Sequence, residues 1–393
     1  MLRRRVEARI ARILYFIGNG ILVILQKIFW PWKRPHEARN VCVYRIGNIG
    51  DVVCAIPAMY SIRHAYPEAR ITLLSSPGKK GMSGSDDLLN GVDWLDEIIM
   101  YYPEDIDTFI KQIRFIWNLR PRKFDVWVEL PNDLATMRVL LRNILVAKIS
   151  GADWAAGWRL NTIRLWGQAQ SEYLVFDNEV TRLLKIVTDY GMDGKPLYPS
   201  FLKGSHAATV DELLRGAGYS SKQIIAIAPG AKRSINRWAA DRFVKIGMYL
   251  VERGYATLVV GGASDKEICL WIANAVGAES KSVAGRLSLL EISELLRRCC
   301  LLISNDSGPQ HLAAAVGTPC ISLFSSRDIK GKWYPSGSDN VVIQKPVSCH
   351  TCFLEECPYD NMCIKLIHVQ DVIEVIDRKL RPLPISTAPR FAS

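Results

Sequence analysis

The sequence has few features that would place it outside the globular proteins. Glycine (27 residues) and proline (19) occur at ordinary levels, so neither a low-complexity nor a collagen-like scaffold is indicated. Charged residues make up 23% of the chain and hydrophobic residues 49%, which excludes a mainly disordered protein. Because 393 residues are too many for one ordinary core, we expect two domains of similar size.

Beyond residue 40, the chain has little excess of positive charge. The formal net charge is +11, but residues 1–40 contain nine Lys or Arg and only two Glu. The other 353 residues therefore carry only +4. A nucleic-acid-binding protein usually spreads basic residues over its binding face. We expect no nucleic-acid partner, and an anionic membrane surface as the partner of the basic segment.

The N-terminal segment, residues 1–39, lacks the roughly 20 consecutive apolar residues that a spanning helix needs. Only residues 13–26 form an uninterrupted stretch without formal charge, and it contains Gly18, Asn19 and Gly20. On a helix, apolar and basic side chains of this segment fall on opposite faces. The apolar face has Leu2, Val6, Ile10, Ile13 and Ile17, and the basic face has Arg4, Arg5, Arg9 and Arg12.

Three interpretations of this segment are open. It is an amphipathic helix lying in the interface of an anionic membrane, a tilted signal anchor, or a helix packed on the protein's own surface. No small-residue cleavage site precedes Trp30-Pro31-Trp32, so a cleaved signal peptide is not expected. The aromatic and basic residues at 30–34 are typical of the headgroup region. We expect a cytoplasmic protein, peripherally associated with the inner membrane.

Beyond this segment, short apolar runs alternate with helical patterns in two series. The first predicts strands at residues 41–46, 70–75 and 124–130, with helices ending near Tyr66 and Val146. The second predicts strands at residues 224–228, 256–260, 301–304 and 319–324, and helices at 239–253, 265–276 and 289–298. Such alternation is typical of α/β proteins with parallel sheets covered on both faces.

The two series predict two doubly wound domains, residues 40–200 and 201–348, with ligands in the cleft between them at the carboxyl ends of strands. A cysteine cluster and a C-terminal helix follow at residues 349–380. The Pro-rich tail at residues 381–393 is expected to be flexible.

The first candidate site follows the opening strand. Gly47 and Gly50 allow a sharp turn and a close approach of the backbone to a ligand. Asp51 comes at the start of the next helix, where it either caps the helix or performs chemistry. The pattern alone favours the cap, and the full dinucleotide-binding fingerprint is absent.

The second candidate site is the start of the helix after the strand at residues 301–304. Asp306, Ser307 and Gly308 lead into this helix, and His311 lies in its first turn. Free N–H groups and the helix dipole at such a start bind phosphate oxygens. The alternative is a capped helix with a buried histidine.

Two further loops follow strands of the second series. One contains Lys232, Arg233 and Arg237, which suit a pyrophosphate or form a solvated basic loop. The other ends in Glu267, a carboxylate suited to ribose hydroxyls or simply to the first turn of a helix.

The order and spacing of these motifs resemble the heptosyltransferases of glycosyltransferase family 9, which transfer heptose from an ADP-sugar to the lipopolysaccharide inner core. The resemblance covers residues 40–377. It is carried by RIGNIGDVVCAIPAMYSIRHAYPEARI, PGAKRSINRWAADRF, GGASDKE, AGRLSL and SNDSGPQHLAAAVGTP. The last motif is the most specific.

This resemblance implies a GT-B fold, with two Rossmann-like domains facing across a cleft. The N-terminal domain then binds the acceptor and the C-terminal domain the nucleotide-sugar donor. Asp51 matches the family's catalytic carboxylate, which changes the preferred interpretation from cap to general base. Among the donor-binding residues, Asp306, Ser307, Gly308 and His311 match those that hold the diphosphate and sugar, Glu267 one that binds ribose, and Leu287 one that covers adenine.

One departure concerns the cation that meets the diphosphate. The family usually has Lys two residues before the tryptophan, and this chain has Asn236. Arg237, Lys232 or Arg233 must then supply the charge. The family reaction inverts the anomeric centre and needs no divalent metal, and its acceptor is a glycolipid. A protein-directed glycosyltransferase and a non-catalytic sugar-nucleotide-binding protein are the alternatives.

Ten cysteines occur in the chain, and six of them lie in apolar stretches and are expected in the core: Cys42, Cys54, Cys269, Cys299, Cys300 and Cys320. The other four form the cluster Cys349-x2-Cys352-x4-Cys357-x5-Cys363. Four such thiolates can bind a structural zinc ion, and reduced or disulfide-linked thiols are the alternative. No cofactor is expected to be required.

Overall fold

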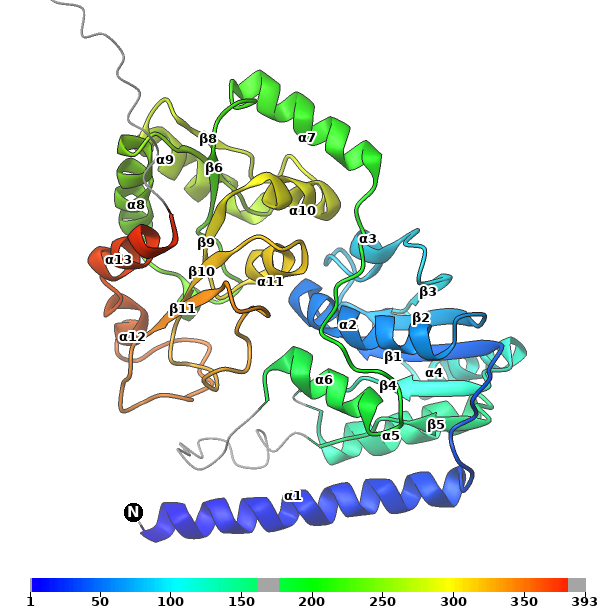
Figure 1. Ribbon diagram of the computed structural model, residues 1–393. Helices are drawn as coiled ribbons and strands as arrows, with labels where there is room; N and C mark the ends of the chain where they lie inside the picture. The colour runs from blue at the N-terminus through cyan, green and yellow to red at the C-terminus, as the bar shows by residue number, and fades with distance from the viewer. Residues whose placement is uncertain (1, 134, 161–176, 381–393) are drawn as a thin grey trace, which may run out of the picture. The chain divides into compact units, whose positions relative to one another are not determined.

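The computed structural model of the chain describes residues 2–133, 135–160 and 177–380, so the tail expected to be flexible lies outside the described residues (Figure 1). The chain divides into two compact units. Unit 1 comprises Met1–Phe201, Ile329–Trp333 and Thr351–Phe353, and unit 2 comprises Leu202–Asp328, Tyr334–His350 and Leu354–Ser393.

Unit 1 contains a parallel sheet with the strand order β3-β2-β1-β4-β5. The strands are β1 (Asn40–Ile46), β2 (Arg70–Ser76), β3 (Glu97–Met100), β4 (Val126–Glu129) and β5 (Trp154–Ala156). The central strand β1 is buried from Val41 to Tyr44 without the alternation of an exposed face. Such a continuous apolar strand is expected where helices cover both faces of a sheet.

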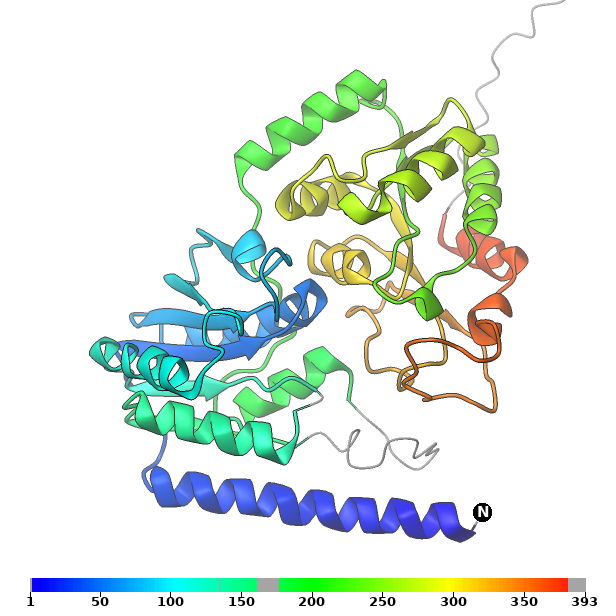
Figure 2. The same cartoon turned by 180° about the vertical axis from the view of Figure 1, so that it is seen from behind.

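Helices cover the two faces of this sheet in pairs. Figures 1 and 2, which show opposite sides, place α2 (Ile49–Ala65) and α6 (Glu179–Thr188) on one face, and α4 (Phe109–Trp117) and α5 (Met137–Ile149) on the other. The short elements α3 (Asp86–Leu89) and η1 (Arg120–Arg122) lie in connections. Helix α2 is apolar nearly all round because it is buried between the sheet and α6.

The N-terminal helix α1 (Leu2–Phe29) packs along α5 in unit 1. A Cβ atom on Gly18 would lie 3.1 Å from Met137 Cε of α5 and 2.4 Å from Leu160 Cδ1, so the glycine lets both side chains pack closely on the helix. Next to it, Asn19 Oδ1 accepts a hydrogen bond from the Leu160 amide at 3.0 Å, and Leu22 is fully buried. Trp30 then stacks on Trp158, with the ring centroids 5.4 Å apart. Gly18, one of the two glycines that weaken a membrane span, therefore serves close packing on the protein, while Gly20 is exposed.

The opposite side of α1 remains uncovered. Its outer face is formed by five apolar side chains, each more than half exposed: Ile13, Phe16, Ile17, Ile24 and Ile28. Their spacing places them on one side of the helix, opposite Gly18 and Leu22. Among the described residues, no helix combines the length and the hydropathy that crossing a membrane requires.

Unit 2 contains a second parallel sheet, with the strand order β11-β10-β9-β6-β7-β8. The strands are β6 (Ile224–Ala228), β7 (Ala256–Val259), β8 (Ser280–Ser282), β9 (Leu301–Asn305), β10 (Cys320–Phe324) and β11 (Val341–Gln344). Alternate residues of its central strands, such as Ile225, Ile303 and Ile321, join one hydrophobic core. This period of two is the expected geometry of a pleated strand.

The helices of unit 2 also form two layers (Figures 1 and 2). One layer has α8 (Ala240–Glu252), α9 (Lys266–Val276) and α13 (Val369–Lys379), and the other has α7 (Gly204–Ala217), α10 (Leu289–Arg298) and α11 (Gly308–Ala315). Shorter elements are η3 (Ser234–Asn236), η4 (Ala263–Asp265) and α12 (Met362–Lys365).

The α/β class with parallel sheets is confirmed, as are the strands predicted from apolar runs, to within about two residues at their ends. The sequence reasoning did not predict the short edge strands β3, β5, β8 and β11. These strands have three or four residues, and β8 consists of Ser-Lys-Ser. An edge strand needs no apolar run, because it is held mainly by backbone hydrogen bonds to one neighbour.

Candidate active site

Asp51 lies in the first turn of α2, immediately after the carboxyl end of β1. Its Oδ2 accepts a hydrogen bond from the Asn48 amide at 2.9 Å, so it does cap the helix. Gly47 has a φ of 148°, and a Cβ atom there would lie 2.4 Å from Asp51 Cβ. The glycine turn thus makes room for the carboxylate, whose side chain keeps 15% of its surface exposed.

Behind Asp51 lies a buried arginine that contacts two carboxylates. Arg45 Nη2 is 3.4 Å from Asp51 Oδ1 and 3.2 Å from Glu179 Oε1. Glu179 is also held by Arg182, whose Nη2 lies 2.7 Å from Oε1. Burial alone would raise the pKa of Glu179, but the charges of Arg182, Lys332 and Arg45 lower it to about 2.

A lysine completes this cluster from a distant part of the sequence. Lys332 is 1% exposed, and its Nζ lies 3.0 Å from Asp133 Oδ2 and 3.7 Å from Glu179 Oε2. The Lys332 carbonyl also accepts a hydrogen bond from the Glu179 amide at 2.9 Å. These contacts lie within unit 1, to which residues 329–333 belong. A buried lysine is stable only when paired in this way.

We call this set the Asp51 cluster: three cations and three carboxylates, namely Arg45, Arg182, Lys332, Asp51, Asp133 and Glu179. Its formal charges cancel. Burial raises the pKa of Asp51 to about 6, Arg45 opposes this shift, and Glu179 and Asp133 add to it. A carboxylate with this pKa is ionised at neutral pH and is still basic enough to accept a proton.

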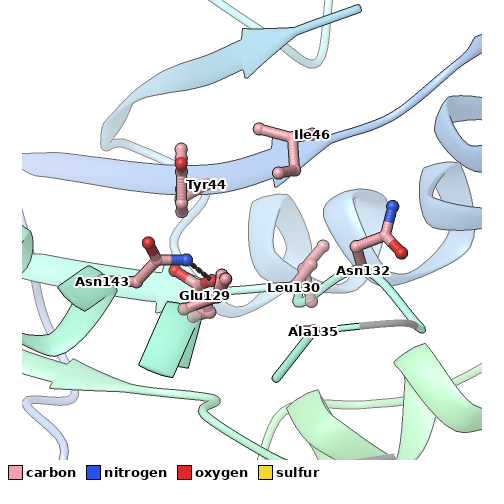
Figure 3. A pocket seen from close by; sticks show the side chains of 8 residues that line it. Tyr44, Ile46, Glu129, Leu130, Asn132, Ala135 and Asn143 are labelled. Carbon is pink, nitrogen blue, oxygen red and sulfur yellow. Dashed lines mark hydrogen bonds between the residues drawn. The ribbon is translucent and has the colours of Figure 1, made fainter. Parts of the chain in front are cut away.

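A pocket of about 160 Å³ lies at the carboxyl ends of β1 and β4. Figure 3 shows Tyr44 and Ile46 from β1, Glu129 from β4, and Asn143 from α5 around it. Asn143 Nδ2 donates a hydrogen bond to Glu129 Oε1 at 2.7 Å. Burial raises the pKa of Glu129 to about 8, against the opposing effects of Asn143 and Arg142. Glu129 is therefore mainly a neutral acid at pH 7.

The pocket and the Asp51 cluster share their backbone support. Leu130 lines the pocket, and its carbonyl accepts a hydrogen bond from Arg45 Nη1 at 3.3 Å. Arg45 therefore contacts both the pocket wall and Asp51. A cavity of about 150 Å³ can hold a six-membered ring, so this pocket has room for one sugar ring.

In unit 2, Asp306 follows β9 and lies beside residues that follow the neighbouring strand β6. Its Oδ2 accepts a hydrogen bond from Asn236 Nδ2 at 3.1 Å, and its Oδ1 accepts one from Gln310 Nε2 at 3.0 Å. Burial raises the pKa of Asp306 to about 7, and the charge of Asp328 adds to this shift. The hydrogen bond from Gln310 and the charges of Arg233 and Arg327 oppose it.

Asn236, at the position where the sequence resemblance leads us to expect lysine, is buried and contacts Asp306 and Ser325. Its Oδ1 accepts a hydrogen bond from Ser325 Oγ at 2.6 Å, while its Nδ2 donates to Asp306. An amide can donate and accept at once, and a lysine can only donate. Asn236 thus holds Asp306 and the loop after β10 together, and brings no charge.

The three candidate cations of the loop after β6 differ in their surroundings. Arg233 Nε lies 2.9 Å from Glu355 Oε2, and Arg237 Nε donates to the Ala231 carbonyl at 2.8 Å. The Lys232 side chain is exposed. Of the three, Arg233 is the one whose charge acts on Asp306.

The start of α11 has the expected form. Ser307 is the extended N-cap residue, Gly308 is the first helical residue and Pro309 follows it. His311 is buried in the first turn, and its Nε2 lies 3.5 Å from Gln310 Nε2. Pro309 has no N–H group and the Gln310 amide donates to the Ser307 carbonyl at 3.3 Å, so the Gly308 amide is the donor of this first turn that suits an anion.

Glu267 and Leu287 follow β7 and β8, the next strands of the same sheet. Glu267 is exposed in the first turn of α9, and Leu287 is half-buried just before α10. Parallel strands end on the same edge of a sheet, so the structure brings the predicted donor-binding residues of unit 2 to one edge.

The four clustered cysteines are free in the structure, and of the six expected core cysteines only Cys300 is not fully buried. Within residues 2–133, 135–160 and 177–380, no three His, Cys, Asp or Glu side chains are arranged to hold a metal ion. The four-thiolate zinc site considered for Cys349, Cys352, Cys357 and Cys363 is therefore not formed there.

Comparison with known proteins identifies the family. The model of "Glycosyltransferase family 9 (heptosyltransferase)" matches residues 112–363, well over half of the chain. The chain belongs to glycosyltransferase family 9. This result confirms the resemblance found in the sequence motifs, and the chain is a glycosyltransferase.

Relatives of this family 9 glycosyltransferase include lipopolysaccharide heptosyltransferase 3 of Escherichia coli, which is 24% identical over 84% of this chain and 96% of its own length. Among solved structures, a family 9 glycosyltransferase from Veillonella parvula covers 86% of this chain and 96% of its own, with a TM-score of 0.70 and 19% identity. E. coli heptosyltransferase WaaC with ADP-2-deoxy-2-fluoro heptose covers 87% of this chain and 100% of its own, with a TM-score of 0.60 and 15% identity. These matches confirm the GT-B fold.

Sequence reasoning missed several residues around the candidate site of this family 9 glycosyltransferase. A charged residue within the apolar strand VCVYRI was a usable signal for Arg45. Arg327 is the third residue after β10, the strand next to β9, and its place after an apolar strand was a second usable signal. No local pattern marks Lys332 or Glu179, because their contacts join segments about 150 residues apart.

Proposed function

We propose that the chain transfers a heptose, or a related sugar, from an ADP-activated donor to the lipopolysaccharide core or another lipid-linked glycan. The observation that carries this proposal is Asp51: a partly exposed carboxylate at a helix start, with a pKa of about 6 and a charge-balanced cluster behind it. Family membership supports glycosyl transfer, and the relatives named as lipopolysaccharide heptosyltransferases support the choice of sugar and acceptor.

In this reaction the acceptor hydroxyl attacks the anomeric carbon from the face opposite the departing ADP, so the configuration inverts. A hydroxyl is a poor nucleophile near neutral pH, and a positioned carboxylate that accepts its proton accelerates such a step by about 10²–10⁴-fold. Asp51 takes this role. The bond from oxygen to the sugar forms as the O–H bond breaks, and Asp51 holds the released proton.

Unit 2 binds the donor in this proposal. Negative charge develops on the leaving diphosphate, and the Gly308 amide at the start of α11, His311 and Arg233 stabilise it. Lys232 and Arg237 contribute from the same loop, while Glu267 binds the ribose and Leu287 covers the adenine. The proposal requires no divalent metal, so turnover should persist in the presence of EDTA.

The pocket between β1 and β4 is proposed to receive a sugar ring of the acceptor. The pocket lies at the carboxyl end of β1, as Asp51 does. Arg45 donates to the Leu130 carbonyl in the pocket wall and also contacts Asp51. Its walls combine apolar groups with a neutral carboxyl, as binding of one face of a sugar requires.

The outer face of α1 is proposed to bind an anionic membrane surface on the cytoplasmic side of the inner membrane. Five large apolar side chains are exposed there, and seven of the eleven net positive charges lie within the first 40 residues. An exposed apolar face next to basic residues is typical of interfacial helices. This arrangement would bring the enzyme to a lipid-linked acceptor.

The direct test incubates the purified chain with ADP-heptose and a deacylated lipopolysaccharide inner-core oligosaccharide. We expect release of ADP and one added heptose on the acceptor, with inverted anomeric configuration by NMR. ADP binding without transfer to any glycan would instead favour a sugar-nucleotide-binding protein. Transfer to protein but not to glycan would favour the protein-directed alternative.

A further inference from the structure

One member of the Asp51 cluster, Lys332, comes from a short segment of unit 1 that is flanked in sequence by unit 2. Lys332 lies in Ile329–Trp333, which belongs to unit 1, while the residues on both sides of this segment belong to unit 2. The segment is fixed by two backbone-carbonyl contacts: the Glu179 amide donates to Lys332 O at 2.9 Å, and Asn178 Nδ2 donates to Gly331 O at 3.3 Å. Lys332 is therefore held in place by the start of α6.

Within the cluster, only Asp51 and Arg182 have side chains more than 10% exposed. Lys332, Glu179 and Arg45 are almost fully enclosed. Charges enclosed in this way interact strongly, because little water screens them. The buried members therefore act on Asp51 from positions that are closed to solvent.

We propose that Glu179 and Lys332 are positioning residues of the reaction. Glu179 makes Asp51 a stronger base, and Lys332 limits this effect by balancing the negative charges of Glu179 and Asp133. The inference rests on the proposed function, in which Asp51 accepts the proton of the acceptor. It adds two residues that touch neither substrate, and it assigns them opposite effects.

The sign of each effect follows from the charges. Without Lys332, Asp133 loses the cation that it contacts and Glu179 keeps only its two arginines, so the surroundings of Asp51 become more negative and its ionisation less favourable. Without the Glu179 charge, Arg45, Arg182 and Lys332 are in excess, so ionisation becomes more favourable. Other groups near Asp51 do not reverse these signs: the Asn48 amide is neutral, and burial raises the pKa of Cys54 well above 9.

The experiment measures kcat/KM between pH 5 and 8.5 with ADP-heptose and the deacylated oligosaccharide. In the wild type, kcat/KM should rise with pH along an acid limb whose midpoint lies near pH 6, the pKa of Asp51. Lys332→Met should move this limb to higher pH, and Glu179→Gln should move it to lower pH, each by about one pH unit. The double variant E179Q/K332M removes one charge of each sign, so its limb should return toward that of the wild type.

Two controls separate this effect from a loss of structure. Lys345→Met removes a partly buried lysine of unit 2 that pairs with Asp371 at 2.6 Å, and it should leave the limb in place. Thermal unfolding identifies variants that fail to fold. If one single variant does not fold, the other still gives a signed prediction, and the double variant should still lie close to the wild type.

An independent readout keeps the inference separate from the proposed function. The pKa of Asp51 is measured by ¹³C NMR of labelled aspartate carboxyls, with Asp51→Asn identifying the signal. Shifts of opposite sign in the two single variants support the electrostatic part of the inference, whatever the activity of Asp51→Asn. Full activity of Asp51→Asn would contradict the assignment of the base, and with it the role of the two residues in the reaction. Unchanged or equally directed shifts would overturn the inference and leave the base assignment intact.

Discussion

At the scale of single residues, the structure explains a departure that the sequence could only flag. Asn236 stands where the sequence resemblance leads us to expect lysine, and its amide hydrogen-bonds to the half-buried Asp306 and the buried Ser325. A positive charge at this position is replaced by a hydrogen-bonded link. In the proposed function the diphosphate is then met by other groups of unit 2, of which Arg233 and Arg327 act electrostatically on Asp306.

This link predicts the effect of Asn236→Ala. The change leaves Asp306 Oδ2 and Ser325 Oγ without the amide, and an unsatisfied buried polar group costs about 1–3 kcal/mol. We expect a lower Tm and ADP binding weakened by about tenfold, measured by calorimetry. Ser264→Ala, at an exposed position after β7, is the control, and ADP affinity equal to wild type in N236A would contradict the link.

Glu129 predicts a dependence of stability on pH. Its pKa is about 8 in the folded protein and near its ordinary value of 4.5 in the unfolded chain. Between these values the folded state keeps a proton that the unfolded state has lost, so its stability falls as pH rises from about 4.5 to 8. Glu129→Gln should weaken this fall, as measured by urea unfolding at several pH values. An identical pH slope in both proteins would show that Glu129 is already ionised in the folded state.

At the scale of elements, one side of α1 is packed on the protein and the other side is exposed. Gly18, Asn19 and Leu22 pack on unit 1, while the outer face carries its apolar side chains into solvent. A packed helix and an interfacial helix were alternatives in the sequence, yet the two sides of one helix allow both. The sequence did not reveal this, because the partners of Gly18 and Asn19 lie about 140 residues further on.

The outer face predicts a selective loss of membrane binding. Replacing Phe16, Ile17 and Ile24 with Gln removes apolar area without touching the packed side, so binding to vesicles with anionic lipid should fall by at least tenfold. Turnover of the deacylated acceptor should stay unchanged. Leu270→Gln with Trp271→Gln, on the exposed surface of α9, is the matched control. Equal vesicle sedimentation of both variants and the wild type would contradict a membrane role for α1.

At the scale of the whole molecule, the sequence predicted what local patterns encode. Apolar runs and helix-start motifs located the central strands, the turn at Gly47 and the start of α11, because their geometry depends on neighbours in sequence. The Asp51 cluster could not be predicted, since it joins β1, α6 and residues 329–333 through contacts across unit 1. Spacing in sequence also does not show whether four thiols meet, so it left the choice between a zinc site and reduced or disulfide-linked thiols open.

The central claim is that Asp51 accepts the proton of the acceptor while unit 2 holds the donor. The most direct measurement compares single-turnover rates and ADP affinities of the wild type, Asp51→Asn and Asp51→Ala, with Asp241→Asn, an exposed first-turn residue of α8, as control. We predict rates lower by about 10²–10⁴-fold in both Asp51 variants, with ADP affinity unchanged. Wild-type rates in Asp51→Asn would contradict the claim, and loss of ADP binding would show that Asp51 supports the structure instead.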